Sequence, residues 1–229
     1  MEFTEDQHRI WARLYANQLP RARKHACSDW LRGFNIMKLP HDRIPQLEEL
    51  NAVITPRTGW RTMRTEVRYT DAFPWYNDHF IKKEFLITDY MRSWEELEFT
   101  PEPDMFHDIF GHMPLMVLPH YTALQDMFAP VFRRANEEQR ENIKRLAWFS
   151  TEFGLIMEEG EMKIFGAGII SSKSETDKVM SGGTKMQKFR IHDVLRRDKA
   201  ITTFNEVLFV FDSIGELKEE LRSYFDAVG

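Results

Sequence analysis

Three side chains near the middle of the sequence have the chemistry of metal ligands. His107 and His112 are the only close pair among the eight histidines, and two imidazoles this near to one another are candidate ligands. The single cysteine, Cys27, excludes an internal disulfide and any cysteine-rich zinc or iron–sulfur site. Any metal must therefore be bound by histidine and carboxylate, and Glu152 is the strongest carboxylate candidate.

Glu152 lies where a carboxylate is costly. On a continuous helix, its neighbours three and four positions away are all apolar: Trp148, Phe149, Leu155 and Ile156. A carboxylate that faces the core costs several kcal/mol unless a proton, a cationic side chain or a metal ion neutralises it. A buried salt bridge is thus one interpretation and a metal ligand the other. Two histidines and one carboxylate form a facial triad that leaves open positions on iron(II) for oxygen and substrate, although ligand type alone leaves zinc or an all-oxygen site open.

The spacing of the two histidines does not bring them together on a regular helix. Five positions correspond to about 140° around an α-helix, whereas the four-position spacing of zinc proteases places both rings on one face. Gly111 can take a left-handed conformation at a helix end and Pro114 disfavours a helical Met113, so we expect the chain to turn and bring His112 back. One core histidine and one surface histidine near a helix end is the alternative.

The elements that must position these residues are mostly helices. Hydrophobic periodicity and breakers predict a helix over 4–18 with a Thr4–Gln7 capping box, a second helix after Pro20, a short helix over 45–54, helices over 121–134 and 136–157, and a last helix over 216–225 with a Ser213–Glu216 capping box. Asp104 is placed to cap the short helix that carries His107. Strand patterns occur at 64–69, 85–91, 163–170 and 204–212. We expect one domain over residues 1–229, mainly α with a few short β-strands (α+β).

Composition sets aside two classes of partner. The formal charge is −5, from 31 basic and 36 acidic residues without a concentrated basic stretch, so we expect no nucleic acid partner. The first residues lack an apolar leader, and nowhere do about 18 uncharged apolar residues follow one another. We expect a cytoplasmic protein with no membrane association.

Three separated motifs carry a resemblance to a known family. The segment TPEPDMFHDIFGHMPLM, followed by WFSTEFGL and then by FGAGIISSKSE, resembles the catalytic domain of the pterin-dependent aromatic amino acid hydroxylases, most closely the short bacterial phenylalanine 4-hydroxylases. The likeness covers nearly the whole chain. It implies a helical basket around a mononuclear non-heme iron, with His107, His112 and Glu152 in the positions of the ligands.

The resemblance also implies an amino acid site. Arg92 matches the arginine that binds the substrate carboxylate, and Asp104 matches the aspartate that holds this arginine. A planar guanidinium can bind a carboxylate in bidentate fashion, which agrees with that role. Without the family match, Arg92 would be interpreted as a surface cation. The positions that match the wall of the aromatic pocket are Thr100, Pro103, Trp148, Gly168, Ser171 and Ile201. For Trp148, core packing is an equal interpretation. We expect the glycines of GAG to let the backbone approach the substrate ring.

The sequence departs from the family on the pterin side. The loop at 67–78 lacks the family's Gly-Leu-rich pattern, and Ala147 stands where a tyrosine is usual, whereas Asp108 keeps the acidic character of a pterin-contacting position. Tyr76, or its neighbours Tyr69 and Trp75, could supply a stacking surface instead, although aromatic residues that pack under a loop explain them equally.

The sequence thus predicts an Fe(2+)-dependent monooxygenase that uses tetrahydropterin and O2 to hydroxylate an aromatic L-amino acid, with phenylalanine to tyrosine as the first expectation. The altered loop and Ala147 motivate one alternative, the same site with another substrate, ring position or reductant. A catalytically silent binder is the non-enzymatic alternative. The family's tetramers form through a C-terminal extension that is absent after FDAVG, and no regulatory domain precedes the catalytic one, so we expect a monomer.

Overall fold

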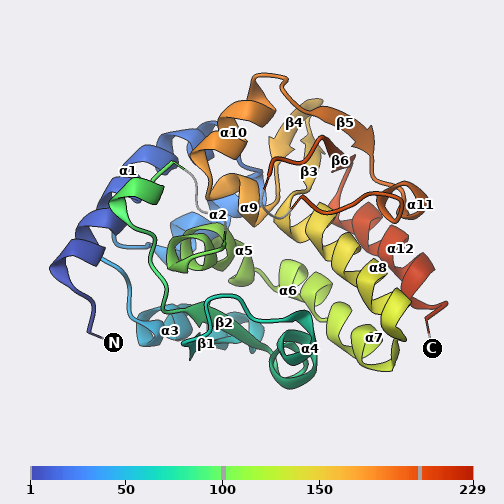
Figure 1. The fold of residues 1–229 in the computed structure, drawn as a ribbon, viewed down its shortest axis with the longest axis horizontal. Helices are drawn as coiled ribbons and strands as arrows, with labels where there is room; N and C mark the ends of the chain where they lie inside the picture. Colours follow the sequence, from blue (N-terminus) through green and yellow to red (C-terminus); the bar gives the residue numbers. More distant parts are fainter. Residues whose placement is uncertain (1, 99–101, 201–202, 229) are drawn as a thin grey trace.

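The structure is a computed structural model that describes residues 2–98, 102–200 and 203–228. Helices surround the short central segments α5 and α9, with a two-stranded sheet at the bottom of the view and a four-stranded sheet at the upper right (Figure 1). This is the mainly helical architecture with a few strands that the sequence predicts. No helix in these described ranges combines the length and apolar character needed to cross a membrane.

Three helices form the N-terminal part: α1 (Glu5–His25), α2 (Ser28–Met37) and α3 (Leu47–Thr58). The Thr4–Gln7 capping box is present, because the Thr4 hydroxyl accepts from the Gln7 amide at 3.2 Å. The predicted break at Pro20 is wrong, since α1 continues through it. Proline in a helix interior removes one hydrogen bond, and apolar residues that α1 buries on both sides of Pro20, including Trp11 and Ala22, offset that loss.

A parallel strand pair follows. Strand β1 (Arg61–Thr65) pairs with β2 (Glu84–Thr88) from Arg61 opposite Glu84 to Thr65 opposite Thr88. Both strands begin and end earlier than the patterns at 64–69 and 85–91 predict. The connection contains α4 (Ala72–Pro74), the π-helical segment η1 (Trp75–His79) and the 3₁₀ turn η2 (Phe80–Lys82), where the sequence predicts only an irregular loop.

The middle of the chain is divided into short helical segments: the 3₁₀ turn η3 (Trp94–Glu96), the π-helical segment η4 (His107–His112), α5 (Met113–Met116), α6 (Pro119–Gln125) and α7 (Phe128–Arg134). The single predicted helix over 121–134 is wrong. Pro130 has no N–H to donate to the Asp126 carbonyl of a continuous helix, whereas in the first turn of α7 that donor is not needed.

The predicted helix over 136–157 ends early. It comprises α8 (Glu137–Ala147) and the π-helical segment η5 (Trp148–Glu152), after which the chain enters β3 (Leu155–Glu158) and β4 (Glu161–Ile164). The predicted strand over 163–170 ends at Ile164, and α9 (Ala167–Ile170) follows. Gly154 marks the change of direction, because its N–H bonds to Ser150 and its carbonyl accepts from Phe165 and Gly166.

The larger sheet has the order β4-β3-β6-β5. Helices α10 (Lys173–Met180) and α11 (Ile191–Val194) precede and follow β5 (Lys185–Lys188), and β6 (Val207–Phe211) confirms the strand predicted at 204–212. The last helix, α12 (Ile214–Phe225), begins as predicted, with the Ser213 hydroxyl accepting from Glu216 at 3.0 Å. Aromatic side chains dominate the core; those with essentially no exposure include Trp11, Trp30, Trp60, Tyr121, Phe106, Phe110, Phe149, Phe165 and Phe209.

Candidate metal centre and ligand cavity

Three side chains from two π-helical segments meet at one point. The Nε2 atom of His107 lies 3.1 Å from Nε2 of His112 and 3.5 Å from Oε2 of Glu152. The Nε2 atom of His112 lies 3.2 Å from Oε1 of Glu152. These three residues are the described group of histidine, cysteine and acidic side chains that could hold a metal ion.

A π-helical turn, rather than a helix end, brings the two histidines together. In η4 the hydrogen bonds span five residues, so side chains five positions apart lie near one another. The expected left-handed turn at Gly111 and non-helical Met113 are therefore wrong, because Met113 has helical angles (φ −63°, ψ −33°). Gly111 serves a different purpose: a Cβ there would lie 2.9 Å from the Ala167 carbonyl oxygen, so glycine lets α9 pack against η4.

Glu152 is held by a second π-helical turn. The Phe153 amide donates to the Trp148 carbonyl five residues earlier at 2.8 Å. The predicted environment of Glu152 is only partly correct, since Leu155 and Ile156 lie in β3 and the Glu152 side chain keeps 27% of its surface exposed, towards a cavity.

Hydrogen bonding prepares His107 to bind a metal. Its Nδ1 atom lies 2.9 Å from the Ser171 hydroxyl, which itself donates to the Ala167 carbonyl at 2.8 Å. Because that hydroxyl proton is committed to the carbonyl, His107 Nδ1 is the donor and Nε2 carries the lone pair. Burial, with a smaller contribution from His112, lowers the pKa of His107 to about 4, which keeps the ring neutral.

The other two ligand candidates are positioned by packing and charge. The His112 ring packs on Phe85 with a centroid distance of 4.9 Å, and its buried Nδ1 has no hydrogen-bond partner within the described ranges. Burial alone would raise the pKa of Glu152, but His112 and His107 outweigh it and hold the pKa below its usual value. Glu152 is therefore an anion at neutral pH.

The spacing of the donor atoms fits one ion. Donors that bind an ion at about 2.1 Å in perpendicular directions lie about 3 Å apart, close to the three distances observed. Two imidazole nitrogens and a carboxylate that occupy one face are the donor set of non-heme iron(II). His107, His112 and Glu152 therefore fit an iron(II) ion.

Arg92 and Asp104 form a buried ion pair beside this centre. Arg92 donates from Nε to Oδ2 at 2.7 Å and from Nη2 to Oδ1 at 2.9 Å, and Asp104 is fully buried. Asp104 Oδ1 also accepts from the His107 amide at 3.0 Å, which confirms the predicted cap. Burial alone would raise the pKa of Asp104, but Arg92 outweighs it, so this pKa stays below its usual value. Asp104 thus links the arginine to the first histidine.

The metal candidates and Arg92 line one cavity of ≈ 280 Å³. Of the predicted pocket residues, those in its wall are Pro103, Trp148, Gly168 and Ser171; Thr100 and Ile201 lie outside the described residues. The Trp148 indole donates to Asn205 at 3.0 Å and packs on Phe153. The glycines of GAG make room for protein atoms, because a Cβ at Gly166 would lie 2.2 Å from the backbone carbonyl oxygen of Glu152 and one at Gly168 would lie 2.8 Å from the Phe153 ring.

The predicted cofactor-side residues also line this cavity. Asp108 accepts from the Thr88 amide at 2.9 Å, and burial raises the pKa of Asp108 to about 7. Ala147 and Tyr76 are in the wall too, with Tyr69 and Trp75. Tyr76 is 7% exposed and packs on Phe132, so it forms part of the aromatic core as well as the cavity wall. Tyr69 is 51% exposed and lies at the cavity mouth.

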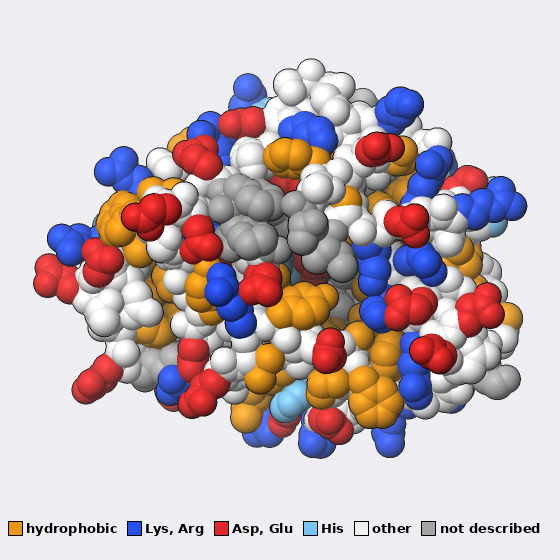
Figure 2. Space-filling model, in the orientation of Figure 1, with side chains coloured by type: hydrophobic (Ala, Val, Ile, Leu, Met, Phe, Trp, Pro, Cys, Tyr) orange, Lys and Arg blue, Asp and Glu red, His pale blue; other side chains and the backbone are white. Residues whose placement is uncertain are grey.

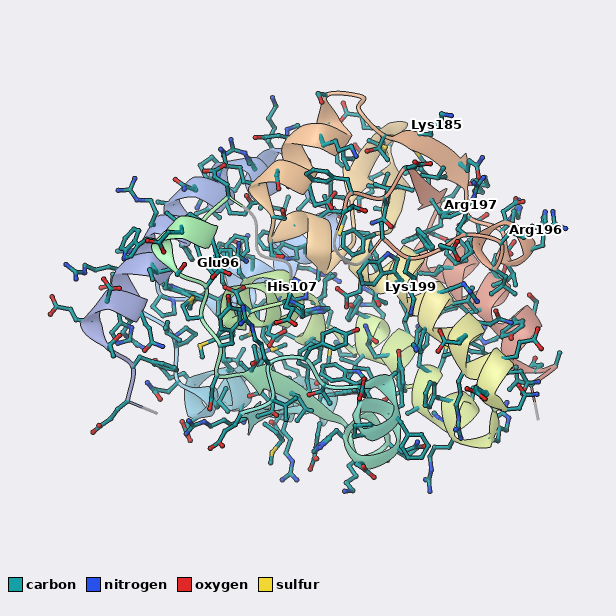
Figure 3. The ribbon with its side chains drawn as sticks, in the orientation of Figure 1. Glu96, His107, Lys185, Arg196, Arg197 and Lys199 are labelled. Carbon is teal, nitrogen blue, oxygen red and sulfur yellow. The ribbon has the colours of Figure 1, made fainter. Side chains whose placement is uncertain are left out.

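Sequence reasoning missed several wall residues, among them Arg68, Phe153, Glu175 and Lys199. Glu175 follows Ser172 at capping-box spacing, which makes it look like a helix cap. Lys199 comes from the chain after α11, far from the motifs in sequence, yet it lines the same cavity as His107. Figure 3 shows it towards the middle of the molecule, whereas Lys185, Arg196 and Arg197 lie nearer the outer edge. Acidic and basic side chains are interspersed over this face (Figure 2).

Comparison with known proteins agrees with this site. The sequence model of the biopterin-dependent aromatic amino acid hydroxylases matches residues 1–229. Phenylalanine-4-hydroxylase of Vibrio cholerae is 32% identical over 95% of this chain and 75% of that protein. Among solved structures, apo phenylalanine hydroxylase from Colwellia psychrerythraea 34H (31% identity, 99% and 88% coverage) has a TM-score of 0.91. The Chromobacterium violaceum enzyme with bound iron(III) and 7,8-dihydrobiopterin (28% identity, 99% and 82% coverage) also gives 0.91.

Proposed function

The chain belongs to the biopterin-dependent aromatic amino acid hydroxylases, and from this membership we propose that it is an iron-dependent, pterin-requiring monooxygenase that converts L-phenylalanine to tyrosine. One observation carries the proposal. A neutral His107, His112 and an ionised Glu152 occupy one side of a cavity, and the guanidinium of Arg92 lies in the wall of the same cavity. A metal ion held by these three ligands and an amino acid bound by Arg92 would therefore share one small space.

Arg92 would bind the substrate carboxylate. Asp104 occupies Nε and one side of Nη2, so the edge formed by Nη1 and the remaining Nη2 proton is left for a second carboxylate. Asp104 Oδ2 also accepts from the Arg92 backbone amide at 3.2 Å, which fixes the arginine further. The amino acid is thereby oriented with its ring towards the metal ligands, between Trp148, Pro103 and Gly168.

His107, His112 and Glu152 would hold iron(II), and Asp108 with the rings of Tyr69, Trp75 and Tyr76 would receive the pterin. When bound, these groups activate O2, so that one oxygen atom enters the ring while tetrahydropterin supplies the two electrons that reduce the other. The chain contributes orientation and exclusion of water. Asp108 has a carboxyl oxygen free to hydrogen-bond the N–H groups of a pterin, since its other oxygen accepts from Thr88.

The direct test removes one ligand at a time. His107→Ala and Glu152→Ala should lose most of the bound iron and should form no tyrosine from phenylalanine, O2 and tetrahydropterin. His192→Ala, at a side chain that is 68% exposed, is the matched control and should behave as wild type. Iron content is measured on the purified proteins and tyrosine by mass spectrometry. Wild-type turnover in either ligand variant would refute the assignment.

A second candidate keeps the iron and amino acid site but changes the substrate or the ring position. It is favoured by Ala147, which lines the cavity where relatives carry a tyrosine, and by the altered loop, of which several residues between Val67 and Tyr76 line the same cavity. Incubation of iron-loaded protein with tetrahydropterin, O2 and a mixture of phenylalanine, tyrosine and tryptophan separates the two. Tyrosine as the main product supports the first proposal, and another hydroxylated amino acid supports the second.

We further propose that residues 1–229 act as one catalytic domain and as a monomer, without a nucleic acid partner. The support is that the three ligand candidates and Arg92 line one cavity, and that acidic and basic side chains are interspersed over the face in Figure 2. A tetramer in sedimentation equilibrium would overturn the monomer.

A further inference from the structure

Glu175 is a carboxylate in the cavity wall that neither the metal centre nor the arginine site uses. It lies in the first turn of α10 and is 8% exposed. The cavity that it lines also holds Arg92, Ser171 and Ser172. A buried carboxylate without a partner is costly, and native structures retain such groups where they have a use.

Glu175 is not explained as a helix cap. Ser172 accepts from the Glu175 amide at 3.3 Å, as in a capping box. The reciprocal bond is missing, because the Ser172 amide donates to the Ile169 carbonyl at 3.2 Å. The carboxylate has no hydrogen bond or ion pair within the described parts of the chain. Lys178, one turn further on, lies with its ammonium 4.4 Å from the centre of the Phe204 ring.

The other carboxylates of the described cavity wall are already engaged. Glu102 pairs with Arg68 at 2.7 Å, Asp108 bonds to Thr88, and Glu152 faces the two histidines. Burial, which the charge of Lys178 offsets only in part, raises the pKa of Glu175 to about 7. Glu175 is therefore the described wall carboxylate that is left for a ligand.

We propose that Glu175 binds the α-ammonium group of the amino acid substrate while Arg92 binds its α-carboxylate. This inference rests on the proposed function and extends it. An amino acid presents one positive and one negative group on the same carbon, so a site that selects it needs one protein charge of each sign. A pocket with Arg92 alone would accept any aromatic carboxylate, whereas the second charge restricts it to amino acids.

The test compares two ligands that differ only in the amino group, L-phenylalanine and 3-phenylpropanoate. Dissociation constants are measured by titration calorimetry on iron-loaded wild type, Glu175→Gln and the control Glu219→Gln, at an exposed residue of α12. Wild type and control should bind L-phenylalanine at least about tenfold more tightly than 3-phenylpropanoate, because a charge-assisted hydrogen bond is at stake. In Glu175→Gln that preference should vanish through weaker binding of L-phenylalanine, with 3-phenylpropanoate unchanged.

A KM-against-kcat comparison distinguishes recognition from a structural role. In Glu175→Gln the KM for L-phenylalanine should rise about ten- to a hundredfold, while kcat at saturation stays within about threefold. Equal affinity of the wild type for the two ligands, or a retained preference in Glu175→Gln, would overturn the inference; the wild-type comparison holds even if the variant fails to fold. If wild type converts no aromatic amino acid, the proposed function falls and this inference with it, whereas normal conversion without preference overturns only the role of Glu175.

Discussion

Replacement of Asp104 by asparagine tests the central ion pair. The fully buried Asp104 side chain accepts from Arg92 three times, through the backbone amide, Nε and Nη2, and once from the His107 amide. Asparagine keeps the size of the side chain and one acceptor oxygen but removes the charge. Since asparagine is also a good helix cap, the bond from the His107 amide can be kept, while the NH2 group then faces the Arg92 backbone amide and Nε.

The expected loss of stability comes from the buried charge of Arg92 that remains. The Arg92 side chain is only 5% exposed, so its charge would be left buried without a counter-charge. Breaking a buried pair by removal of one partner costs about 3–5 kcal/mol. For a chain of this size, about 2–4 °C of melting temperature corresponds to each kcal/mol, so the midpoint should fall by roughly 10 °C.

The assay is thermal and urea unfolding followed by circular dichroism, with Asp177→Asn as the matched control. Asp177 pairs with Arg21 at 2.8 Å but is 53% exposed, so its loss should cost less than about 1 kcal/mol. The double variant Arg92→Gln/Asp104→Asn should recover part of the loss, because no buried charge remains. A change below about 1 kcal/mol for Asp104→Asn would refute the reasoning.

Three further predictions concern the walls of the site. Ser171→Ala removes the acceptor that sets the tautomer of the first histidine, so chelator competition should show iron affinity about 10- to 100-fold lower; unchanged affinity would contradict this role. Gly166→Ala places a Cβ 2.2 Å from the backbone carbonyl oxygen of Glu152, so it should lower the stability to urea by about 3 kcal/mol and should also lower the amount of bound iron. The control Gly215→Ala in α12 meets no atom closer than 3.5 Å and should be neutral or stabilising. Similar effects of the two variants would count against the close contact. The pKa of Glu175 is raised from 4.5 to about 7, so its contribution to stability is present below pH 4.5 and is lost as pH rises through 7. Glu175→Gln should thus be more stable than wild type at pH 8, by up to about 3 kcal/mol, and equal stability from pH 5 to 8 would speak against a buried, unpartnered carboxyl.

The parts of the site that rest on residue type and burial could be predicted from sequence. The ligand set His107, His112 and Glu152 follows from the absence of other soft ligands and from an expensive carboxylate. Asp104 was predictable as a cap because capping depends on neighbours three residues away. The second role of Asp104, holding Arg92, came from the resemblance alone.

The predicted elements that are wrong are those in which tertiary packing overrides the local sequence pattern. A helix pattern that continues past Glu152 cannot reveal that residues 155–158 pair with β4 and β6. Nor can strand propensity at 163–170 reveal that Gly166 packs against the Glu152 backbone and Gly168 against the Phe153 ring, where α9 begins. Pro20 misleads because its local cost is offset by contacts distant in sequence. Glu175 was overlooked because its spacing from Ser172 is that of a capping box, of which the structure forms only the bond from the Glu175 amide.

The π-helical segments η4 and η5 make the site depend on chain length as well as on residue type. Each contains a turn with one residue more than an α-helix would use. Deletion of a single codon inside either segment would leave all three ligand types in the protein and would favour the more regular hydrogen bonding of an α-helix. It would also rotate His112 or Glu152 away from the common point. A substitution scan would never expose this sensitivity, whereas a deletion scan across 107–112 and 148–152 would map it directly, and it would find well-folded proteins that have lost the metal.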